Sequence, residues 1–287
     1  MTLKAYQVDA FTNQGQGGNP AGVVLNADKL SPQQMQTIAK TLGFSETAFI
    51  SKDDECDFHI RFFTPNSEVD FCGHATLASF YLLFQQNIIS AASYRQRTKA
   101  GKLAVTVYPD GLVEMQQTLP QFITKVPAEA VAASLNISPD VINALAYPLE
   151  IVSTGLSDII IPLPPGYLAK ITPNFAAITK LSEQYQVIGY HAFELAPVDS
   201  SFTASCRNFA PAVGINEESA TGSACGALAS YLFKHQLIDG SHYLFEQGRA
   251  MNCPSTIKAS ITAEHQQITE VKVAGYAQLI TSHIICT

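Results

Sequence analysis

The segment Arg61-Phe-Phe-Thr-Pro65, followed by Cys72-Gly-His-Ala-Thr-Leu-Ala-Ser-Phe80, occurs twice in the chain in slightly altered form. The second copy reads Arg207-Asn-Phe-Ala-Pro211, followed by Ser223-Ala-Cys-Gly-Ala-Leu-Ala-Ser-Tyr231. The two Arg-x-Phe-x-Pro motifs begin 146 residues apart, which is about half the chain. A repeat of this length predicts two similar domains, and a small-molecule site between domains is the first place to look for function.

Shorter matches between the two halves of the chain occur in the same order and at nearly the same spacing, such as Ala48-Phe49 with Ala192-Phe193. We therefore predict an N-terminal domain over residues 1–118 and a C-terminal repeat over residues 119–287. The proline-containing stretch 117–127 is the candidate linker. The tail from 266 to 285 alternates and is typical of a hairpin, and its last strand, about 276–287, is a candidate to return to the first domain.

The stretch from His74 to Phe84 is apolar at nearly every position, and so is its counterpart from Ser223 to Phe233. A helix that is apolar all round must be buried all round. The other periodic segments indicate strands and two capped helices, one starting after Ser31 and one near Thr172. We expect an α+β fold in which each domain is a curved, mostly antiparallel β-sheet or barrel wrapped around a central α-helix.

Composition excludes several classes of function. Charged residues make up 14% of the chain, hydrophobic residues make up 47%, and the net charge is −7 without a basic run. Nucleic acid and membranes are therefore not expected partners. The six cysteines contain no Cys-x-x-Cys pair, and the N-terminus has no apolar leader, so a cytoplasmic protein with reduced thiols is expected. No phosphate-binding loop occurs, so a nucleotide cofactor is not supported, and no His/Cys/carboxylate cluster has metal-ligand spacing, so a metal is not expected.

Each buried helix begins in a loop of small residues, Cys72-Gly73-His74 in one copy and Ala220-Thr-Gly-Ser223 in the other. Helix N-termini carry unpaired N–H groups and partial positive charge, and glycine lets a ligand approach the backbone. Two such helix ends would form a cradle for a substrate carboxylate. The alternative is that the glycines only allow tight strand-to-helix turns.

The duplication separates folding residues from chemical ones, because a residue needed for folding should occur in both copies. Glu46 precedes Ala48-Phe49 by two positions, and the matching position of the second copy is Tyr190. A carboxylate in one copy only, between two phenylalanines, is suited to general acid/base work. The alternative is a strand glutamate that faces water.

Other candidates have alternatives of their own. His74 is unmatched in the second copy and starts a helix, although a lone histidine is often structural. The pair Glu217-Glu218 precedes the second loop and could be ordinary helix capping. Cys72 and Cys225 could pass for the paired thiols of a racemase, but Cys225 lies inside the helix pattern, so both are interpreted as packing residues.

Together these motifs resemble the phenazine-biosynthesis (PhzF-like) isomerase family, which shares its fold with diaminopimelate epimerase. The resemblance extends from the first strand to about Pro254 and is carried by Tyr6-Gln-Val-Asp-Ala-Phe11, Gly18-Asn-Pro-Ala-Gly22, Ser45-Glu-Thr-Ala-Phe49, Arg61-Phe-Phe-Thr-Pro65, Glu68-Val-Asp-Phe-Cys-Gly-His-Ala-Thr76 and Ala220-Thr-Gly-Ser223. It implies catalysis without metal or organic cofactor in a cleft between the two domains, and commonly a homodimer.

The resemblance also implies residue roles. Glu46 matches the family's acid/base glutamate, His74 its active-site histidine, and Ser223 the serine of its Ala-Thr-Gly-Ser turn. Glu218 stands where the family usually has aspartate, and the stretch 252–255 lacks the arginine of the frequent Gly-Arg-Pro-Ser motif. The predicted substrate-binding set is Asn19, Gly73, Thr221, Gly222 and Ser223.

The sequence therefore predicts a cofactor-independent isomerase that moves a proton between carbons of a small carboxylate-bearing substrate. Glu46 would move the proton, while His74 and Glu218 would orient the substrate and share the proton traffic. Backbone N–H groups of the two helix starts would stabilise developing negative charge. Two alternatives stay open: a racemase or epimerase on the same fold, and an inactive small-molecule-binding protein. The sequence does not name the substrate.

Overall fold

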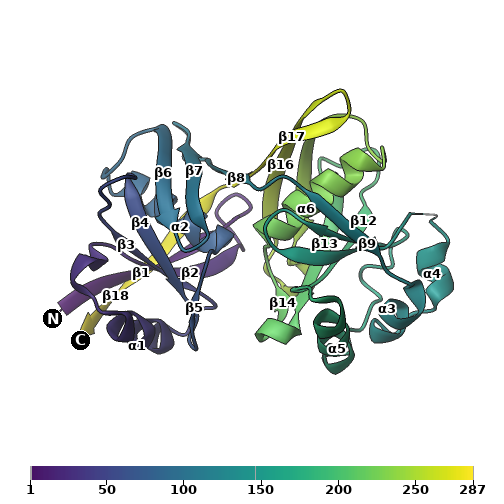
Figure 1. The fold of residues 1–287 in the computed structure, drawn as a ribbon, viewed down its shortest axis with the longest axis horizontal. Coiled ribbons are helices and arrows are strands. Elements are labelled where there is room, and N and C mark those ends of the chain that lie inside the picture. The colour runs from purple at the N-terminus through teal and green to yellow at the C-terminus, as the bar shows by residue number, and fades with distance from the viewer. Residues whose placement is uncertain (1, 146, 287) are drawn as a thin grey trace. The chain divides into compact units, whose positions relative to one another are not determined.

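The computed structural model describes residues 2–145 and 147–286. They form two compact units: within the described residues, unit 1 contains 2–116 and 274–286, and unit 2 contains 117–145 and 147–273. The sequence predicts the boundary at 118 and the returning strand at about 276. Figure 1 shows the elements of both units.

Unit 1 is built mostly from strands. Its elements are β1 (Thr2–Ala10), β2 (Asn19–Val24), the 3-10 turn Ala27–Lys29, α1 (Pro32–Leu42), β3 (Thr47–Ser51), β4 (Phe58–Phe63), β5 (Glu68–Val69), α2 (Gly73–Gln85), β6 (Ala92–Thr98), β7 (Gly101–Val107), β8 (Val113–Gln117) and β18 (Ala277–Cys286). Strand β8 runs to the boundary of the unit.

Unit 2 contains the remaining elements. They are β9 (Gln121–Lys125), α3 (Ala128–Ser134), α4 (Pro139–Asn143), β10 (Glu150–Ser153), β11 (Ser157–Pro162), α5 (Phe175–Tyr185), β12 (Gly189–Leu195), β13 (Ala204–Ala210), the 3-10 turn Pro211–Val213, β14 (Ile215–Glu218), α6 (Gly222–Lys234), β15 (His242–Gln247), the 3-10 turn Arg249–Met251, β16 (Ser255–Glu264) and β17 (Gln267–Gly275).

The strand pairing repeats from one unit to the other. In unit 1, β18 pairs antiparallel with β1 and β1 with β2, then β2 runs parallel to β3, β3 antiparallel to β4, β4 parallel to β6, and β6 antiparallel to β7. In unit 2 the same succession is β9, β10, β11, β12, β13, β15 and β16. The sequence repeat is therefore a repeat of topology, with β18 in the place that β9 holds in unit 2.

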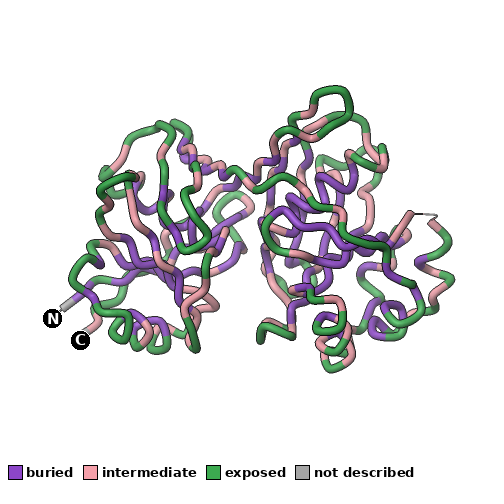
Figure 2. Tube along the Cα trace, viewed as in Figure 1, coloured by how far each residue is buried: buried purple, intermediate pink, exposed green. Residues whose placement is uncertain are grey.

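Each sheet wraps around one apolar helix. Helix α2 contacts β1, β2, β3, β7 and β18, whereas α6 contacts β10, β11 and β16. Most residues of the two helices are buried (Figure 2). Phe80 and Tyr231, which occupy matching positions, are both fully buried. The predicted α+β architecture of a curved sheet around a central helix is confirmed.

A second device is common to both units. Arg61 on β4 makes two hydrogen bonds to Glu68, with Nε–Oε1 at 2.7 Å and Nη2–Oε2 at 2.9 Å, and lies over the ring of Phe63. Arg207 on β13 makes the same pair with Glu217, at 2.8 and 2.9 Å, and lies over Phe209. Bidentate pairs of this kind fix geometry. Each therefore holds the short strand, β5 or β14, that leads into the buried helix.

Outer helices complete each core. Helix α1 places Met35, Ile38 and Ala39 against apolar side chains of β1, β2 and β3. It begins with the predicted capping box of Ser31 and Gln34 and ends at Gly43, whose φ is 72°. In unit 2, α3, α4 and α5 cover the other face of the sheet, with residues such as Val131, Ile142 and Ile178 fully buried.

Three local expectations were wrong. The stretch 117–127 is no linker, because Gln121–Lys125 forms β9 and pairs with β10. The helix expected near Thr172 begins at Phe175, because Asn174 is its N-cap and accepts a hydrogen bond from the N–H of Ala177. The tail forms no simple hairpin, because β18 pairs with β1 in unit 1 whereas β17 falls in unit 2 up to Val273.

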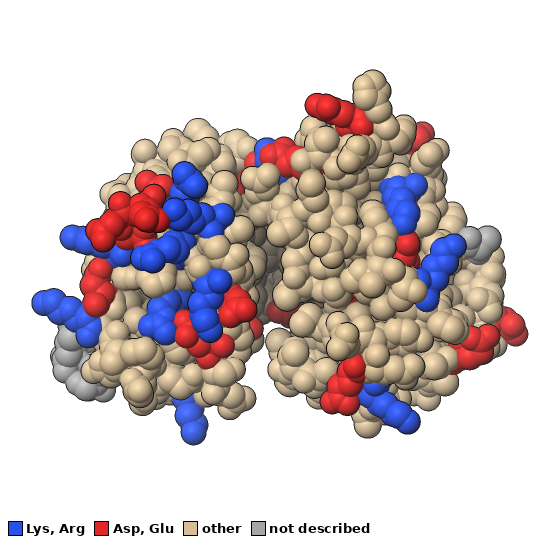
Figure 3. All heavy atoms as spheres, in the orientation of Figure 1, with Lys and Arg blue, Asp and Glu red and all other residues tan. Residues whose placement is uncertain are grey.

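Charged side chains of unit 1 lie among opposite charges. On the face seen in Figure 3, lysines and arginines of β6 and β7 are interspersed with acidic residues. Arg97 pairs with Asp53, and the Nζ atom of Lys102 lies 2.6 Å from Glu55. Over the described residues, no helix is both long and apolar enough to cross a membrane.

The close approach of strands β12 and β13 predicts that replacement of Gly189 by any larger residue destabilises the fold. A Cβ atom there would lie 1.9 Å from the carbonyl oxygen of Phe209 on the paired strand β13. We expect Gly189→Ala to lower the free energy of unfolding of unit 2 by about 1–3 kcal/mol or more, because backbone must move. At Gly73, nothing lies within 4 Å of a Cβ position. Alanine there should change the free energy of unfolding by less than about 1 kcal/mol. Urea denaturation of both variants measures the difference, and equal effects would contradict it.

Candidate active site

The candidate site of unit 1 lies around Glu46 and His74. Glu46 Oε2 lies 3.4 Å from His74 Nε2, and the side chains are 13% and 5% exposed. Ser45 Oγ lies 3.4 Å from the same ring nitrogen, and Cys72 Sγ lies 3.3 Å from Nδ1. The two residues that the sequence singled out as unmatched in the second copy are therefore neighbours in space.

Two backbone features position this pair. After Gly43 ends α1, the chain enters β3, and the carbonyl oxygen of Glu46 accepts a hydrogen bond of 3.0 Å from the N–H of Gly22 on β2. His74 is the second residue of α2, directly after Gly73 and the N-cap Cys72. The carboxylate is therefore positioned by the start of β3 and the imidazole by the start of α2, and both are rigid elements.

Glu46 Oε2 is buried and accepts no hydrogen bond within the described residues, since its contact with His74 lacks hydrogen-bond geometry. A buried carboxylate oxygen without a donor is rare, because it loses its hydration without replacement. Such an atom is available to a proton, a substrate or a cation. Glu46, Cys72 and His74 also place one metal-ligand atom each within 4.8 Å of one another. The sequence spacing alone gave no sign of this.

The candidate site of unit 2 lies at the start of α6. The Glu218 carboxylate accepts a hydrogen bond from the hydroxyl of Thr221. Gln247 ties this loop together: its amide donates to the Glu218 carbonyl oxygen at 2.7 Å and to Thr221 Oγ1 at 3.0 Å, and its oxygen accepts from the Thr221 N–H at 3.2 Å. Glu218 and Thr221 both stay partly exposed.

The predicted cradle residues lie where expected along the chain. Gly222 and Ser223 form the first turn of α6, where N–H groups have no partner within the helix. Gln117 donates to the Gly222 carbonyl oxygen at 3.0 Å, and Thr154 donates to that of Ser223 at 3.0 Å, so this turn is held firmly. Asn19 is buried at the first position of β2, opposite Ala10.

The Arg–Glu device resolves the ambiguity of Glu217 and Glu218. Glu217 is the partner of Arg207, as Glu68 is the partner of Arg61, so its role is shared by both copies and structural. Glu218 follows it by one residue, and the matching position of unit 1 is Val69. Glu218 is thus a second carboxylate that occurs in one copy only, like Glu46.

Sequence reasoning missed a buried polar cluster behind the candidate site of unit 2. His191 Nδ1 lies 3.3 Å from the amide of Asn208, and its Nε2 lies 3.9 Å from Cys225 Sγ. Asp158 lies nearby at 1% exposure, with Oδ1 lacking any partner within the described part of the chain. These groups have no place in a purely apolar core, because a buried polar atom without a partner is destabilising.

Burial dominates the electrostatics of this cluster. It raises the pKa of Asp158 to about 7, against the lowering effect of His191 and the Asn208 hydrogen bond. Burial also disfavours the Cys225 thiolate, but hydrogen bonds from Cys206 and His191 outweigh it and lower the pKa of Cys225 to about 6. Cys206 carries the proton of this thiol pair, since its pKa is raised by burial and by Cys225.

The duplication could have revealed this cluster. His191 matches Thr47, Asn208 matches Phe62, and the strand pairing aligns Asp158 with Pro20. None of the three polar groups recurs in unit 1. Comparing every buried position of the two copies, rather than only the motifs, would therefore have singled out these residues.

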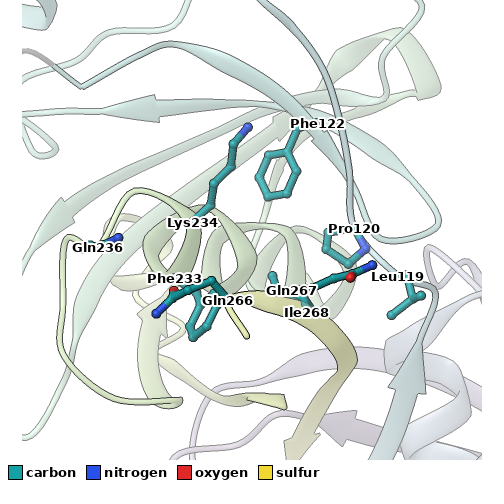
Figure 4. Close-up of a pocket in the computed structure, with 9 residues that line it drawn as sticks. All are labelled: Leu119, Pro120, Phe122, Phe233, Lys234, Gln236, Gln266, Gln267 and Ile268. Carbon is teal, nitrogen blue, oxygen red and sulfur yellow. The ribbon is translucent and has the colours of Figure 1, made fainter. Parts of the chain in front are cut away.

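A separate groove of about 380 Å³ lies in unit 2 at the other end of α6 (Figure 4). Phe122, Phe233 and Ile268 line it. Lys234 Nζ lies 3.7 Å from the ring centroid of Phe122 and 2.8 Å from Glu150 Oε1, so its charge is already paired. The groove is a helix length, about 18 Å, from the start of α6 and holds none of the predicted acid/base groups.

The architecture is that of two-domain racemases and epimerases. The crystal structure of a hydroxyproline epimerase from Agrobacterium vitis, with bound trans-4-hydroxy-L-proline, matches with a TM-score of 0.67 over 99% of this chain and 91% of that chain. Its sequence identity is 11%, so this likeness concerns the fold. The predicted diaminopimelate epimerase-like fold class agrees with it.

Closer relatives define the family. Residues 8–282 match the phenazine biosynthesis-like (PhzC-PhzF) family. An uncharacterized isomerase of Clostridium acetobutylicum is 38% identical over 96% of this chain and 95% of its own length. The crystal structure of a PhzF-family protein of Bacillus anthracis matches with a TM-score of 0.90 and 27% identity over the whole of both chains. The chain belongs to the PhzC-PhzF family and is an enzyme of the isomerase class.

The raised pKa of Asp158 predicts a pH-dependent stability. Between the ordinary pKa of 3.8 and the folded value of about 7, the folded state keeps a proton that the unfolded state has released. The free energy of unfolding therefore falls as pH rises through this window and levels off above it. Asp158→Asn should flatten this slope and gain as much as about 4 kcal/mol relative to the natural chain near pH 8.

Urea denaturation from pH 4.5 to 8 measures this slope. Because the chain has no tryptophan, unfolding is monitored by far-UV circular dichroism. The matched control is Asp199→Asn, an exposed aspartate of unit 2, which should leave the slope unchanged. An unchanged slope for Asp158→Asn would show that Asp158 is ionised in the folded protein throughout.

Proposed function

We propose that the chain is a cofactor-independent isomerase that moves a proton between two carbon atoms of a small carboxylate-bearing substrate. The observation that carries this proposal is the Glu46 carboxylate, which is mostly buried beside His74 and has an oxygen without a hydrogen-bond donor. A positioned carboxylate of this kind can take a proton from carbon and return it elsewhere. Acid/base catalysis of this kind accelerates a reaction by roughly 10²–10⁴-fold.

His74 is proposed to hold the substrate and to pass protons to and from Glu46. Its ring lies between Cys72 on one side and Glu46 and Ser45 on the other. A ring with one nitrogen on each side can donate at one and accept at the other.

The helix starts are proposed to bind the substrate carboxylate and the developing negative charge. Gly73 leaves open space beside its backbone, with nothing within 4 Å of a Cβ position. Gly222 and Ser223 offer a second set of first-turn N–H groups. Preorganised donors of this kind are worth several kcal/mol in a site that excludes water. Glu218, held by Thr221, would share the proton transfer on the same substrate.

Epimerisation at a single carbon is the second candidate, and one observation favours it: Cys72 Sγ lies 3.3 Å from His74 and close to Glu46. A two-thiol racemase needs a second reactive cysteine at the other helix start. Cys225 does not fill that role, because it is fully buried inside α6 and contacts His191. A carboxylate mechanism through Glu46 is therefore the better supported of the two. Phenazine biosynthesis enters here only through the family's name. A homodimer and a cytoplasmic location remain predictions.

The central test follows deuterium. Small carboxylic and amino acids that raise the melting temperature are incubated in heavy water, and NMR follows exchange and rearrangement of their carbon-bound protons. Glu46→Gln should slow exchange by at least about 10²-fold while the ligand still binds. Glu183→Gln, an exposed glutamate on α5, is the control. Exchange at full rate in Glu46→Gln would leave binding, without proton transfer by this residue, as the function.

The length of the Glu218 side chain gives a second test. Aspartate, the usual family residue at this position, is one methylene shorter and cannot reach Thr221 in the same way. We expect Glu218→Gln to slow turnover and Glu218→Asp to retain more of it, with altered preference among substrates. Steady-state rates on two or more hits measure both effects. If Glu218→Gln were as active as the natural enzyme, the role of Glu218 would be to hold the loop through its hydrogen bond with Thr221.

A further inference from the structure

Three donor atoms in the candidate site of unit 1 have the chemistry of a zinc site. Glu46 supplies a carboxylate oxygen, Cys72 a sulfur and His74 a ring nitrogen, and these atoms lie within 4.8 Å of one another. A thiolate, an imidazole and a carboxylate are the ligands that Zn²⁺ prefers, and sites with three protein ligands keep a fourth position open. The thiolate disfavours Mg²⁺ and Ca²⁺, which prefer oxygen ligands.

The distances suit a tetrahedral ion. With bonds of about 2.0–2.3 Å, neighbouring ligand atoms of a tetrahedral zinc site lie about 3.3–3.6 Å apart. The distance from His74 Nε2 to Glu46 Oε2 is 3.4 Å, and the distance from His74 Nε2 to Cys72 Sγ is 4.0 Å. The first fits directly, and rotation of one short side chain, that of Cys72, can close the second.

A second observation points to a ligand here. Glu46 Oε2 is buried and accepts no hydrogen bond from the described residues. A cation would supply the missing charge partner and remove the desolvation penalty of that oxygen. The charges also balance, because one thiolate and one carboxylate neutralise Zn²⁺ and leave little net charge for the positive end of α2 to repel.

The second copy lacks this set, so the repeat provides an internal comparison. The position of Glu46 is occupied by Tyr190, whose hydroxyl accepts a hydrogen bond from Ser134 in the core. In the register that matches Phe80 with Tyr231, Ser223 stands at the position of Cys72 and Cys225 at that of His74. The three ligands are therefore a property of unit 1 alone.

We propose that Glu46, Cys72 and His74 bind Zn²⁺, and that the bound ion reversibly blocks the acid/base group of unit 1. The blocking role rests on the proposed function, because the ion occupies the carboxylate oxygen that would accept the substrate proton. The binding itself does not depend on that function. The site thus makes the enzyme sensitive to free zinc.

Metal titration tests the binding without any substrate. We expect Zn²⁺ to bind the purified, metal-free protein at one ion per chain by calorimetry, and Co²⁺ to give a thiolate charge-transfer band. Cys72→Ser, His74→Asn and Glu46→Gln should each weaken binding at least tenfold. Cys56→Ser and Cys253→Ser, which alter the two partly exposed thiols, are matched controls and should leave it unchanged. Circular dichroism confirms that each variant is folded.

The outcomes separate the two proposals. Binding that survives Cys72→Ser, or that is lost in Cys253→Ser, would overturn the zinc site. Deuterium exchange on a substrate should stop when the site is saturated with Zn²⁺ and return on addition of EDTA. Exchange that continues at saturation overturns the blocking role. If the natural chain binds zinc as expected but Glu46→Gln still exchanges deuterium at the full rate, the proposed function is refuted and the zinc site stands.

Discussion

Complete burial of one apolar helix in each unit is the constraint on which the rest of the structure depends. Helices α2 and α6 have no polar face, so each must be enclosed by strands on every side. Only the ends of such a helix can reach polar surroundings. The N-terminal end, with its unpaired N–H groups, is the natural place for a polar site. In each unit, the candidate residues lie at or beside that end.

The duplication shows which charged residues hold this arrangement and which do not. Arg61–Glu68 and Arg207–Glu217 form the same bidentate pair over a phenylalanine ring, so both copies use it to guide the chain into the buried helix. Glu46 has a buried tyrosine as its counterpart. The contrast assigns the paired carboxylates to folding and supports the proposed acid/base role of the unmatched one, without any comparison with other proteins.

Local signals in the sequence predicted much of this fold, and pairwise signals did not. The Ser31 capping box and the apolar run from His74 have one local meaning each, and both were found. The cluster of Asp158 and His191 was missed, because its members come from separate strands and no periodicity connects them. The stretch that contains β9 was predicted to be a linker because of its prolines. Its identity depends on pairing with β10.

The place of β18 has a consequence for biosynthesis. Unit 2 is continuous in sequence, so all of its strands are synthesised before β18. Unit 1 receives β18, the neighbour of β1, only after the strands of unit 2 have been made. The unit that begins first is therefore completed after the other, and until β18 is in place β1 presents an open edge to other chains.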